Sequence, residues 1–442
     1  MTIQAERIAV RPEEADPAAV VPVIPVGLAQ ERPSLYICLL GYRSHPYGGG
    51  QGIYIKYLSK ALTDAGHRVD VISGEPYPHL DPRVRLIKLP GMNLYEKGLG
   101  SLRLRNLASW ADCREWLGKL TGCFSEPLSF GLRADAYLRR HGHRYDLIHD
   151  NQSLAYGMLK VQRRQPLVTT VHHPITSDLV IALNAAQSWW QKLLARRWYH
   201  FLTMQKRVAS RLSHVVTVSE QSRQDIALAF GRPVESITLV YNGIDTAVFS
   251  TRPGVVRRRR RIMATASADA PLKGVRYLLE AYAQLLATYP DLELLMVSKP
   301  QPGGATDRLL DVLGVRDRVQ FVSGISTEQL VEFYAQATLV VVPSVYEGFG
   351  LPAGEAMACG VPVVSTTGGA LPEVVGDAGL LVPTCNAAAL ARAMATLLDD
   401  EPLREELGAR GRARILELFS WDVCAQQMTH YYREVLQDYA NR

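Results

Sequence analysis

The chain has 442 residues, a length at which one hydrophobic core usually gives way to two domains. Its formal net charge of +6 is mild and does not by itself imply a nucleic-acid partner, so we expect none, and its composition is that of an ordinary globular protein. Its six cysteines form no Cys-x-x-Cys pair, which argues against a zinc ribbon or disulfide framework and fits a reducing cytoplasm.

The N-terminal stretch is rich in proline. Residues 1–33 hold no basic region leading into a long apolar core, so we expect a disordered tail rather than a signal peptide. No run of 18 apolar residues without charges occurs, so no segment is expected to span a bilayer.

The ordered part is expected to begin with a strand at Leu35–Leu40, which runs into a glycine-rich loop, Gly48 to Gly52. A helix and a second strand follow by residue 72, an order typical of a nucleotide-binding βαβ unit. The glycines do not fit Gly-x-Gly-x-x-Gly, because Ile53 stands where the last one belongs. A dehydrogenase with Asp70 on a ribose is therefore a weak alternative, and a loop whose glycines only permit tight packing is another.

The rest of the first half alternates short strands with helical stretches, which implies a parallel sheet covered on both faces. The expected strands are 84–89, 146–149, 167–171, 215–218 and 237–240. Residues 91–143 are less regular, and the pattern assigns no element to them.

A linker at 250–256 and five consecutive arginines precede a second series of alternating elements. Like-charge runs are usually solvated, so we expect Arg257–Arg261 on the surface, with phosphate or lipid-headgroup contact as the alternative. The expected strands are 262–266, 292–298, 319–322, 339–342 and 361–365, and the expected helices are 275–286, 328–337, 386–398, 402–419 and one containing 431–439. The pattern predicts a second doubly wound sheet.

The most informative stretch follows the strand at 339–342 and runs from Tyr346 to Gly360. Gly348 and Gly350 let the backbone turn sharply, and Pro352 suits a first helical position. A strand, a glycine turn and a helix leave backbone N–H groups and a positive dipole end free to bind a phosphate.

Two carboxylates flank this turn, Glu347 before it and Glu355 inside the helix. An ionised carboxylate only accepts hydrogen bonds, so the ligand should offer hydroxyl donors as well as phosphate. A sugar nucleotide meets both requirements. The alternative is that the two glutamates decorate a turn and cap a helix.

Two glutamates separated by seven residues around a Gly-Phe-Gly turn resemble the motif of glycosyltransferase family 4, the retaining enzymes of the GT-B fold. Tyr241–Asp245 is similar to the family's closing motif of the first domain. The resemblance covers the chain from about residue 35 and implies two Rossmann-like domains facing across a cleft. The implied parts are a tail at 1–33, an acceptor-binding domain at 34–250, a nucleotide-sugar-binding domain at 251–419 and a C-terminal helix at 420–442 that crosses back to the first domain.

The resemblance also implies transfer of a hexose from a UDP- or GDP-sugar to a hydroxyl acceptor, with retention and without a protein nucleophile. Glu347 would then face the hexose, Glu355 the ribose and Lys273 the diphosphate. The implied catalytic residues are His172, Lys273 and Glu347, and the implied substrate-binding residues are Gly49, Gly50, Gly52, Ser267, Lys273, Glu347, Gly348, Phe349, Gly350, Leu351 and Glu355.

His172 ends a predicted strand, where ligands bind in open α/β sheets, and it aligns with the family's histidine beside the transferred sugar. His173 is the neighbouring alternative, and a hydrogen-bonded structural histidine is the other. No Asp-x-Asp motif occurs in the chain, so we expect no metal and no other cofactor.

The chain departs from the family before Lys273, where an arginine usually stands and where Ser267 occupies about the same place. Either neutral hydrogen bonds replace that arginine, or a cation reaches in from elsewhere in the chain. The candidates are Arg43, Arg223 and Arg276.

Two rival functions remain open, a nucleotide-sugar epimerase on the same scaffold and a catalytically silent sugar-nucleotide binding protein. An epimerase needs no acceptor, so product analysis separates it from a transferase. The presence of Lys273, Glu347 and Glu355 in this chain argues against the silent protein.

The stretch from Trp189 to Val208 predicts a helix with an apolar stripe and many cations. Trp190, Leu194, Phe201 and Val208 share the stripe, an arrangement that suits peripheral binding to an anionic membrane and an acceptor carrying a lipid or a glycan. A helix packed on the first sheet is the alternative. The expected location is the cytoplasm, with a peripheral position at the inner face of the membrane as its variant.

Overall fold

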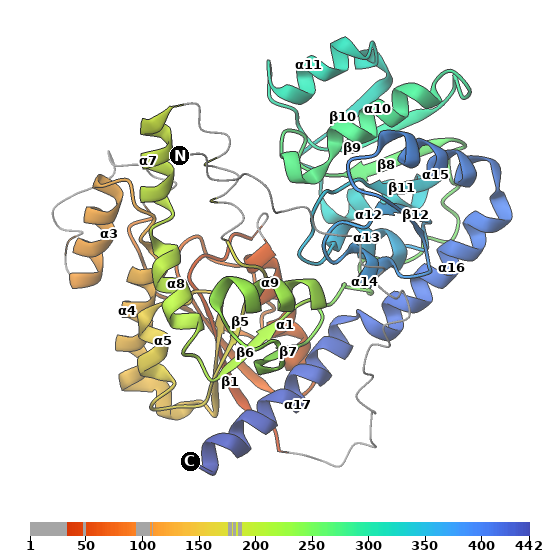
Figure 1. Ribbon diagram of the computed structural model, residues 1–442. Helices are drawn as coiled ribbons and strands as arrows, with labels where there is room; N and C mark the ends of the chain where they lie inside the picture. The colour runs from red at the N-terminus through yellow and green to blue at the C-terminus, as the bar shows by residue number, and fades with distance from the viewer. Residues whose placement is uncertain are drawn as a thin grey trace. The chain divides into compact units, whose positions relative to one another are not determined.

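The computed structural model describes residues 33–46, 50–93, 107, 109–175, 179, 183 and 188–442. Two parallel β-sheets organise these residues (Figure 1). The first sheet has seven strands in the order β3-β2-β1-β4-β5-β6-β7, and the second has six in the order β10-β9-β8-β11-β12-β13. The prediction of two doubly wound, Rossmann-like sheets is confirmed.

The strands of both sheets are short. Those of the first sheet are β1 (Tyr36–Gly41), β2 (Arg68–Ser73), β3 (Arg85–Lys88), β4 (Leu147–Asn151), β5 (Leu167–Thr170), β6 (His214–Thr217) and β7 (Ile237–Leu239). Those of the second sheet are β8 (Arg261–Thr265), β9 (Glu293–Val297), β10 (Val319–Val322), β11 (Leu339–Val342), β12 (Val363–Thr366) and β13 (Leu380–Val382).

Helices connect the strands. In the first half these are α1 (Gly50–Asp64), α3 (Trp110–Leu120), α4 (Glu126–His141), α5 (Tyr156–Val161), α7 (Trp189–Trp198), α8 (Phe201–Ala209) and α9 (Glu220–Phe230). In the second half they are α10 (Val275–Leu285), α11 (Ala305–Val312), α12 (Thr327–Gln336), α13 (Leu351–Ala358), α14 (Leu371–Val375), α15 (Ala387–Asp399), α16 (Glu401–Leu418) and α17 (Trp421–Ala440). None of the helices within the described ranges is long and apolar enough to cross a membrane.

Alternation of side chains along β1 divides the core of the first sheet between its two faces. Ile37 and Leu39 pack in one buried cluster with side chains of α1 and α17, while Cys38 and Leu40 pack in another with side chains of α4 and α5. Each buried aliphatic side chain stabilises the fold by about 1.5–3 kcal/mol, so the helices on both faces of the sheet contribute to its stability.

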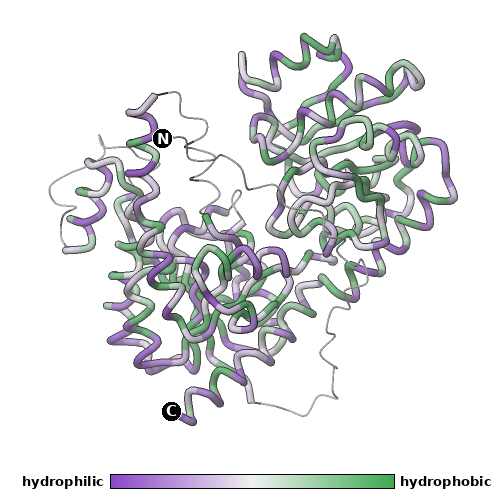
Figure 2. The backbone as a smooth tube through the Cα atoms, in the orientation of Figure 1, coloured by the Kyte–Doolittle hydropathy of each residue, from purple (hydrophilic) through white to green (hydrophobic). Residues whose placement is uncertain are grey.

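The final helix α17 belongs to the core of the first sheet. It runs from Trp421 to Ala440, and Ser420 accepts a hydrogen bond from the amide of Val423 as N-cap, so it contains the stretch 431–439 that was expected in a last helix. Figure 2 shows hydrophobic and hydrophilic segments alternating along it. Residues Pro33–Arg442 form one compact unit, and the domain bounds at 250 and 419 stay a prediction.

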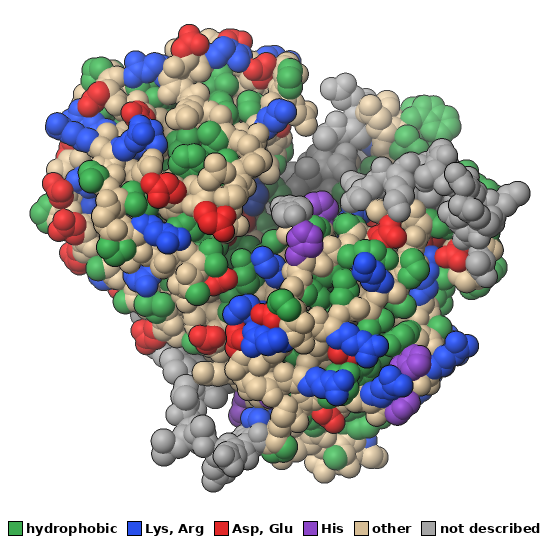
Figure 3. All heavy atoms as spheres, turned by 180° about the vertical axis from the view of Figure 1, so that it is seen from behind, with side chains coloured by type: hydrophobic (Ala, Val, Ile, Leu, Met, Phe, Trp, Pro, Cys, Tyr) green, Lys and Arg blue, Asp and Glu red, His purple; other side chains and the backbone are tan. Residues whose placement is uncertain are grey.

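The arginine run is only partly solvated. Arg261 is the first residue of β8 and is buried, with its Nε 2.7 Å from Glu293 and its amide bonded to Thr338. Arg257 donates to the carbonyl of Gly360. The expected surface position is therefore wrong for Arg261. Its guanidinium can be buried at the start of β8 because it is paired with a carboxylate. On the face in Figure 3, both positively and negatively charged side chains are visible.

The single helix expected from Trp189 to Val208 is two helices. α7 ends at Trp198 and α8 begins at Phe201, so the predicted apolar stripe is broken. Phe201 and Val208 are buried, whereas α7 has no buried residue. Packing on the protein core is thus correct for α8, and the exposed side chains of the predicted stripe, Trp190 and Leu194, belong to α7.

Candidate functional site

A cavity of about 370 Å³ brings together the carboxyl ends of strands from both sheets. In each sheet the strand order reverses at a central pair, β1 and β4 in the first and β8 and β11 in the second. Ligands bind outside the carboxyl ends of strands at such points. We call this space the central cavity; its lining includes Gly50, Tyr54, His172, His173, Asn242, Lys273, Glu347, Gly348, Phe349, Gly350, Leu351, Glu355 and Trp421.

An ion pair stands at the second-sheet side of the central cavity. Lys273 Nζ lies 2.7 Å from Glu347 Oε1, and the hydroxyl of Ser344 donates to the same oxygen at 2.8 Å. Lys273 ends a 3₁₀ turn after β8, while Glu347 follows β11, so the pairing of these two neighbouring strands sets the contact. The side chain of Glu347 is largely buried, whereas that of Lys273 is one-third exposed.

The glycine turn after Glu347 presents backbone amides to the cavity. Gly350, which directly precedes α13, has a φ of +103°. Residues with a side chain rarely adopt this backbone conformation. A Cβ there would also lie 2.8 Å from Leu371 Cδ2. Within the described part of the chain, the amides of Gly350 and Leu351 have no hydrogen-bond acceptor, so they are available to an anion at the helix N-terminus.

Glu355 lies one turn into α13 and lines the same cavity. The hydroxyl of Tyr334 donates to its Oε2 at 3.1 Å. Burial raises the pKa of Glu355 to about 7, an effect larger than the lowering caused by that hydrogen bond. The carboxyl is therefore poised between its two protonation states near neutral pH, and ligand hydroxyls that donate to it would favour the ionised form.

His172 stands at the first-sheet side, just after β5. Its Nε2 lies 2.7 Å from Asn151 Oδ1, and its amide donates to Gln152 Oε1 at 2.8 Å. Burial, reinforced by two neighbouring histidines, lowers the pKa of His172 to about 3, so the ring is neutral. Because Asn151 Nδ2 donates to the carbonyl of Gln51, its Oδ1 is the acceptor, which places the proton on His172 Nε2 and leaves Nδ1 as an acceptor.

The two edges touch through the start of α9. The hydroxyls of Ser219 and Ser222 donate to the carbonyl of Gly348 at 2.7 and 3.2 Å. Glu373 of α14 accepts hydrogen bonds from the amides of Glu220 and Gln221 at 2.7 and 2.8 Å. A helix of the first sheet therefore holds the glycine turn of the second.

The glycine-rich loop after β1 is divided between three placements. Gly50 lines the central cavity. Gly52 is not among the residues that line it. A Cβ at Gly52 would lie 2.2 Å from the carbonyl oxygen of His45, so this glycine permits tight backbone packing. The predicted site residue Gly49 lies outside the described residues.

A second space, of about 670 Å³, lies beyond the carboxyl ends of β8 and β9, and we call it the second-sheet cavity. Ser267 lines it, and Lys273 lines both cavities. The three arginines considered as replacements for the family's arginine are placed elsewhere. Arg43, Arg223 and Arg276 pair with Glu126, Glu220 and Glu280, and none of the three lines either cavity.

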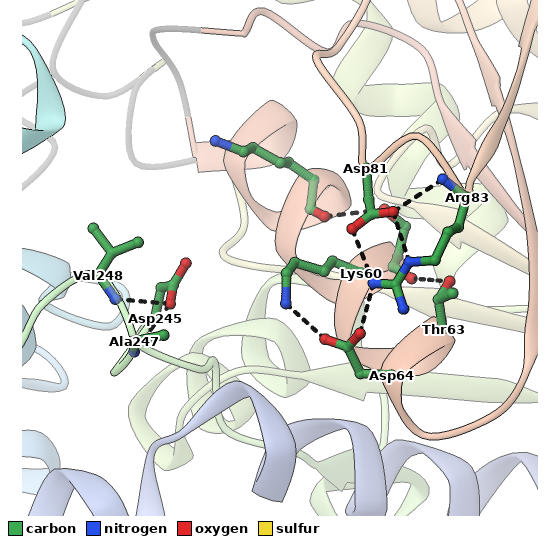
Figure 4. Close-up of polar contacts among 10 residues, drawn as sticks. Lys60, Thr63, Asp64, Asp81, Arg83, Asp245, Ala247 and Val248 are labelled. Carbon is green, nitrogen blue, oxygen red and sulfur yellow. Dashed lines mark hydrogen bonds and ion pairs between the residues drawn. The ribbon is translucent and has the colours of Figure 1, made fainter.

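Sequence reasoning missed the side chains that hold the predicted ones in place. Ser344 is three residues before Glu347, a spacing that could have indicated it, but Tyr334 comes from α12 and gave no local signal. The same holds for Trp421, which reaches the cavity from the final helix. Asp245, also in the lining, is fixed by hydrogen bonds from the amides of Ala247 and Val248 (Figure 4).

Comparisons with known proteins find similarity along both halves of the chain. The family model described as Glycosyltransferase Family 4 matches residues 48–248, and the one described as Glycosyl transferases group 1 matches 252–414. An MMP alpha-(1->4)-mannosyltransferase of Mycolicibacterium hassiacum is 44% identical over 407 residues, which cover 90% of this chain and 98% of the relative.

Two further matches extend over most of the chain. A D-inositol 3-phosphate glycosyltransferase of Acidothermus cellulolyticus is 31% identical over 411 residues, which cover 88% of this chain and 86% of that protein. The solved structure of sucrose-phosphate synthase from Thermosynechococcus elongatus has a TM-score of 0.69 at 27% identity and covers 91% of this chain and 100% of its own.

Proposed function

The chain belongs to glycosyltransferase family 4, and we propose that it transfers a hexose, with retention of configuration, from a nucleotide diphosphate sugar to a hydroxyl acceptor. Its glycosyltransferase nature follows from the family. One observation carries the finer proposal: Lys273, Glu347, Glu355 and the free amides of the glycine turn converge on one cavity. Cations and amides suit a diphosphate, and carboxylates suit the hydroxyls of a ribose and a sugar.

The reaction needs the bond between the anomeric carbon and the diphosphate oxygen to break while the acceptor oxygen bonds to the same carbon. Lys273 and the amides of Gly350 and Leu351 stabilise the negative charge that grows on the leaving diphosphate. An oxygen of that diphosphate takes the acceptor proton on the same face of the sugar, so no protein nucleophile is required. Glu347 orients the hexose through its hydroxyls, and the neutral ring of His172 offers Nδ1 as an acceptor beside it.

Mannose is the first sugar to test, because the relative that shares 44% of its residues with this chain is named a mannosyltransferase. The experiment is thermal unfolding with GDP-mannose, GDP-glucose, UDP-glucose and UDP-galactose. A ligand bound by the native state raises the melting temperature, by an amount that grows with its concentration relative to Kd. We expect one donor to stabilise the protein clearly more than the others. No stabilisation by any nucleotide sugar would contradict the proposal.

Product analysis then separates transfer from epimerisation. With the stabilising donor and an acceptor panel, we expect a new glycoside whose anomeric configuration matches that of the donor. Conversion of the donor into its epimer without an acceptor would favour the epimerase. Stabilisation without any turnover would favour a silent binding protein.

A lipid-linked acceptor and peripheral membrane binding are a second proposal, supported by α7. Its Trp189, Trp190 and Leu194 are 65%, 57% and 60% exposed, and its sequence holds Lys192, Arg196 and Arg197 with no acidic residue. Exposed rings beside cations suit the headgroup region of an anionic membrane.

The test is co-sedimentation with phosphatidylglycerol-rich vesicles at low and high salt. We expect pelleting at low salt, weaker pelleting at high salt, and loss of pelleting in the Trp190→Ser, Leu194→Ser double variant. Leu228→Ser is the matched control, because Leu228 of α9 is 87% exposed on another helix. A folded protein that stays in the supernatant at low salt would leave a soluble acceptor as the better hypothesis.

A further inference from the structure

The positive charge at the donor site is small for a diphosphate. Of the residues that line the two cavities, Lys273 and Lys299 are the ones with cationic side chains, histidines aside. Lys273 is already held by Glu347 at 2.7 Å, so part of its charge is compensated inside the protein. The place where family members carry an arginine is taken by Ser267, which is uncharged.

Lys299 comes from the strand next to that position. β8 and β9 are paired in parallel register, with Thr265 opposite Val297 at their carboxyl ends. Ser267 and Lys299 are therefore each two residues beyond a matched pair. Because neighbouring strands lie about 4.8 Å apart, the two residues leave the sheet side by side.

Hydrogen bonds keep the two loops together beyond the sheet. The amide of Ala268 donates to the hydroxyl of Ser298 at 2.9 Å. Asp269 accepts from the amide of Gln301 at 2.8 Å with one carboxylate oxygen and from the amide of Thr306 at 3.0 Å with the other. The loop that carries Lys299 is thus fixed against the loop that carries Ser267.

The side chain of Lys299 is left available by this arrangement. It is exposed, and it makes no ion pair or hydrogen bond with the described residues of the chain. Asp269 is the acidic residue in the lining of the second-sheet cavity, but each of its carboxylate oxygens already accepts a hydrogen bond from a backbone amide that fixes the loop. A flexible ammonium without a fixed partner is suited to meet a phosphate as a point charge.

We propose that Lys299 supplies, from the loop after β9, the cation that Ser267 does not supply from the loop after β8. It binds the diphosphate of the donor nucleotide together with Lys273. The phosphates are then contacted by cations from the segments that follow two adjacent strands, β8 and β9. The inference rests on the proposed function, since it needs a nucleotide donor.

Calorimetric titration with GDP, UDP, guanosine and uridine tests the inference on the full chain. For whichever diphosphate the parent binds, Lys299→Met should weaken binding about tenfold, because a charge-assisted contact is lost while the apolar stem is kept. Lys299→Arg should bind within about threefold of the parent, because the charge is retained. Affinity for the nucleoside should not change. Lys160→Met is the matched control, because Lys160 is an exposed lysine of α5, outside both cavities.

A rescue variant tests the same point from the other side. Adding Ser267→Arg to Lys299→Met should restore most of the lost diphosphate affinity, because the family's cation returns to its usual place. Equal binding of GDP and UDP by parent and Lys299→Met would overturn the inference and leave the proposed function intact. Equal weakening of nucleoside and diphosphate would also overturn it, since Lys299 would then contact the base. A parent that binds none of the four probes would instead contradict the proposed function.

Discussion

The two sheets present chemically different edges to the central cavity. At the first-sheet edge, His172 is neutral and donates hydrogen bonds to the side-chain oxygens of Asn151 and Gln152. At the second-sheet edge, Lys273 and Glu347 form an ion pair beside free backbone amides. A neutral edge suits uncharged hydroxyls, while a charged edge suits a leaving group whose negative charge grows in the transition state. Losses of activity should therefore be largest at the second sheet.

The largest effect is expected for Lys273→Ala. Removing a group that stabilises transition-state charge typically costs about 10²–10³-fold in kcat, and here it also leaves Glu347 without its cation. Both kcat and donor binding should fall.

Glu347→Ala should mainly lower kcat, because its partner is on the reacting sugar. Steady-state kinetics with the identified donor measure both, and folded variants with parental kinetics would show that the charged edge is not the donor site.

A smaller effect is expected for His172→Ala at the neutral edge, about 10–10²-fold in kcat/KM, through lost orientation of the sugar. Because burial holds the pKa of His172 near 3, the ring stays neutral across the assay range. The kcat/KM profiles of parent and variant should therefore run parallel from pH 5 to 8. An inflection near pH 6.5 that disappears in the variant would contradict the neutral edge.

Glu355 should contribute about tenfold to donor affinity, with a pH dependence that His172 lacks. Its pKa of about 7 lies above the ordinary 4.5, so the folded protein holds a proton that the unfolded chain releases between these pH values. Stability is thus lost as pH rises through this window. Donor affinity should rise from pH 6 to 8, because ribose hydroxyls donate to the ionised carboxylate.

Glu355→Gln separates these two consequences. The variant should lose the pH dependence of donor binding and, without donor, melt at a higher temperature than the parent at pH 8, with no difference near pH 4. Thermal unfolding and donor titration at pH 4, 6 and 8 measure both consequences. A variant that is less stable than the parent at pH 8 would mean that the carboxylate is not strained by burial.

The smallest effect is expected for an exposed ion-pair network near the end of α1, whose residues are not in the lining of either cavity. Arg83 bridges Asp64 at the end of α1 and Asp81, and Lys60 joins through Asp64 (Figure 4). Exposed pairs contribute little because water and salt screen them. Arg83→Ala should leave kcat and KM within about twofold of the parent, measured in the same assay. A large loss would extend the functional surface to this network.

The sequence was most informative where local pattern and burial agree. The strands at 319–322 and 339–342 have the predicted bounds. The second is a fully buried run rich in valine, a pattern typical of a strand covered on both faces. The break between α7 and α8 was missed, because Tyr199 and His200 interrupt the helix without glycine or proline.

The site was predictable in part for the same reason. Glu347 and Glu355 flank a glycine turn that is legible as sequence, and the structure places both in one cavity with Lys273. Contacts that join distant segments left no local pattern: Tyr334 on Glu355, Trp421 in the lining, and Lys299 beside Ser267 depend on strand order and on the return of the last helix. The roles of these residues stay predictions until they are measured.

We propose that the charged edge of the second sheet, through Lys273 and the amides of the glycine turn, stabilises the leaving diphosphate without a metal ion. The most direct measurement is the rate of glycosyl transfer in excess EDTA, before and after magnesium or manganese is restored. We expect a rate in EDTA close to that of the untreated protein, with modest stimulation by metal at most. A rate that vanishes in EDTA and returns with either metal would contradict it.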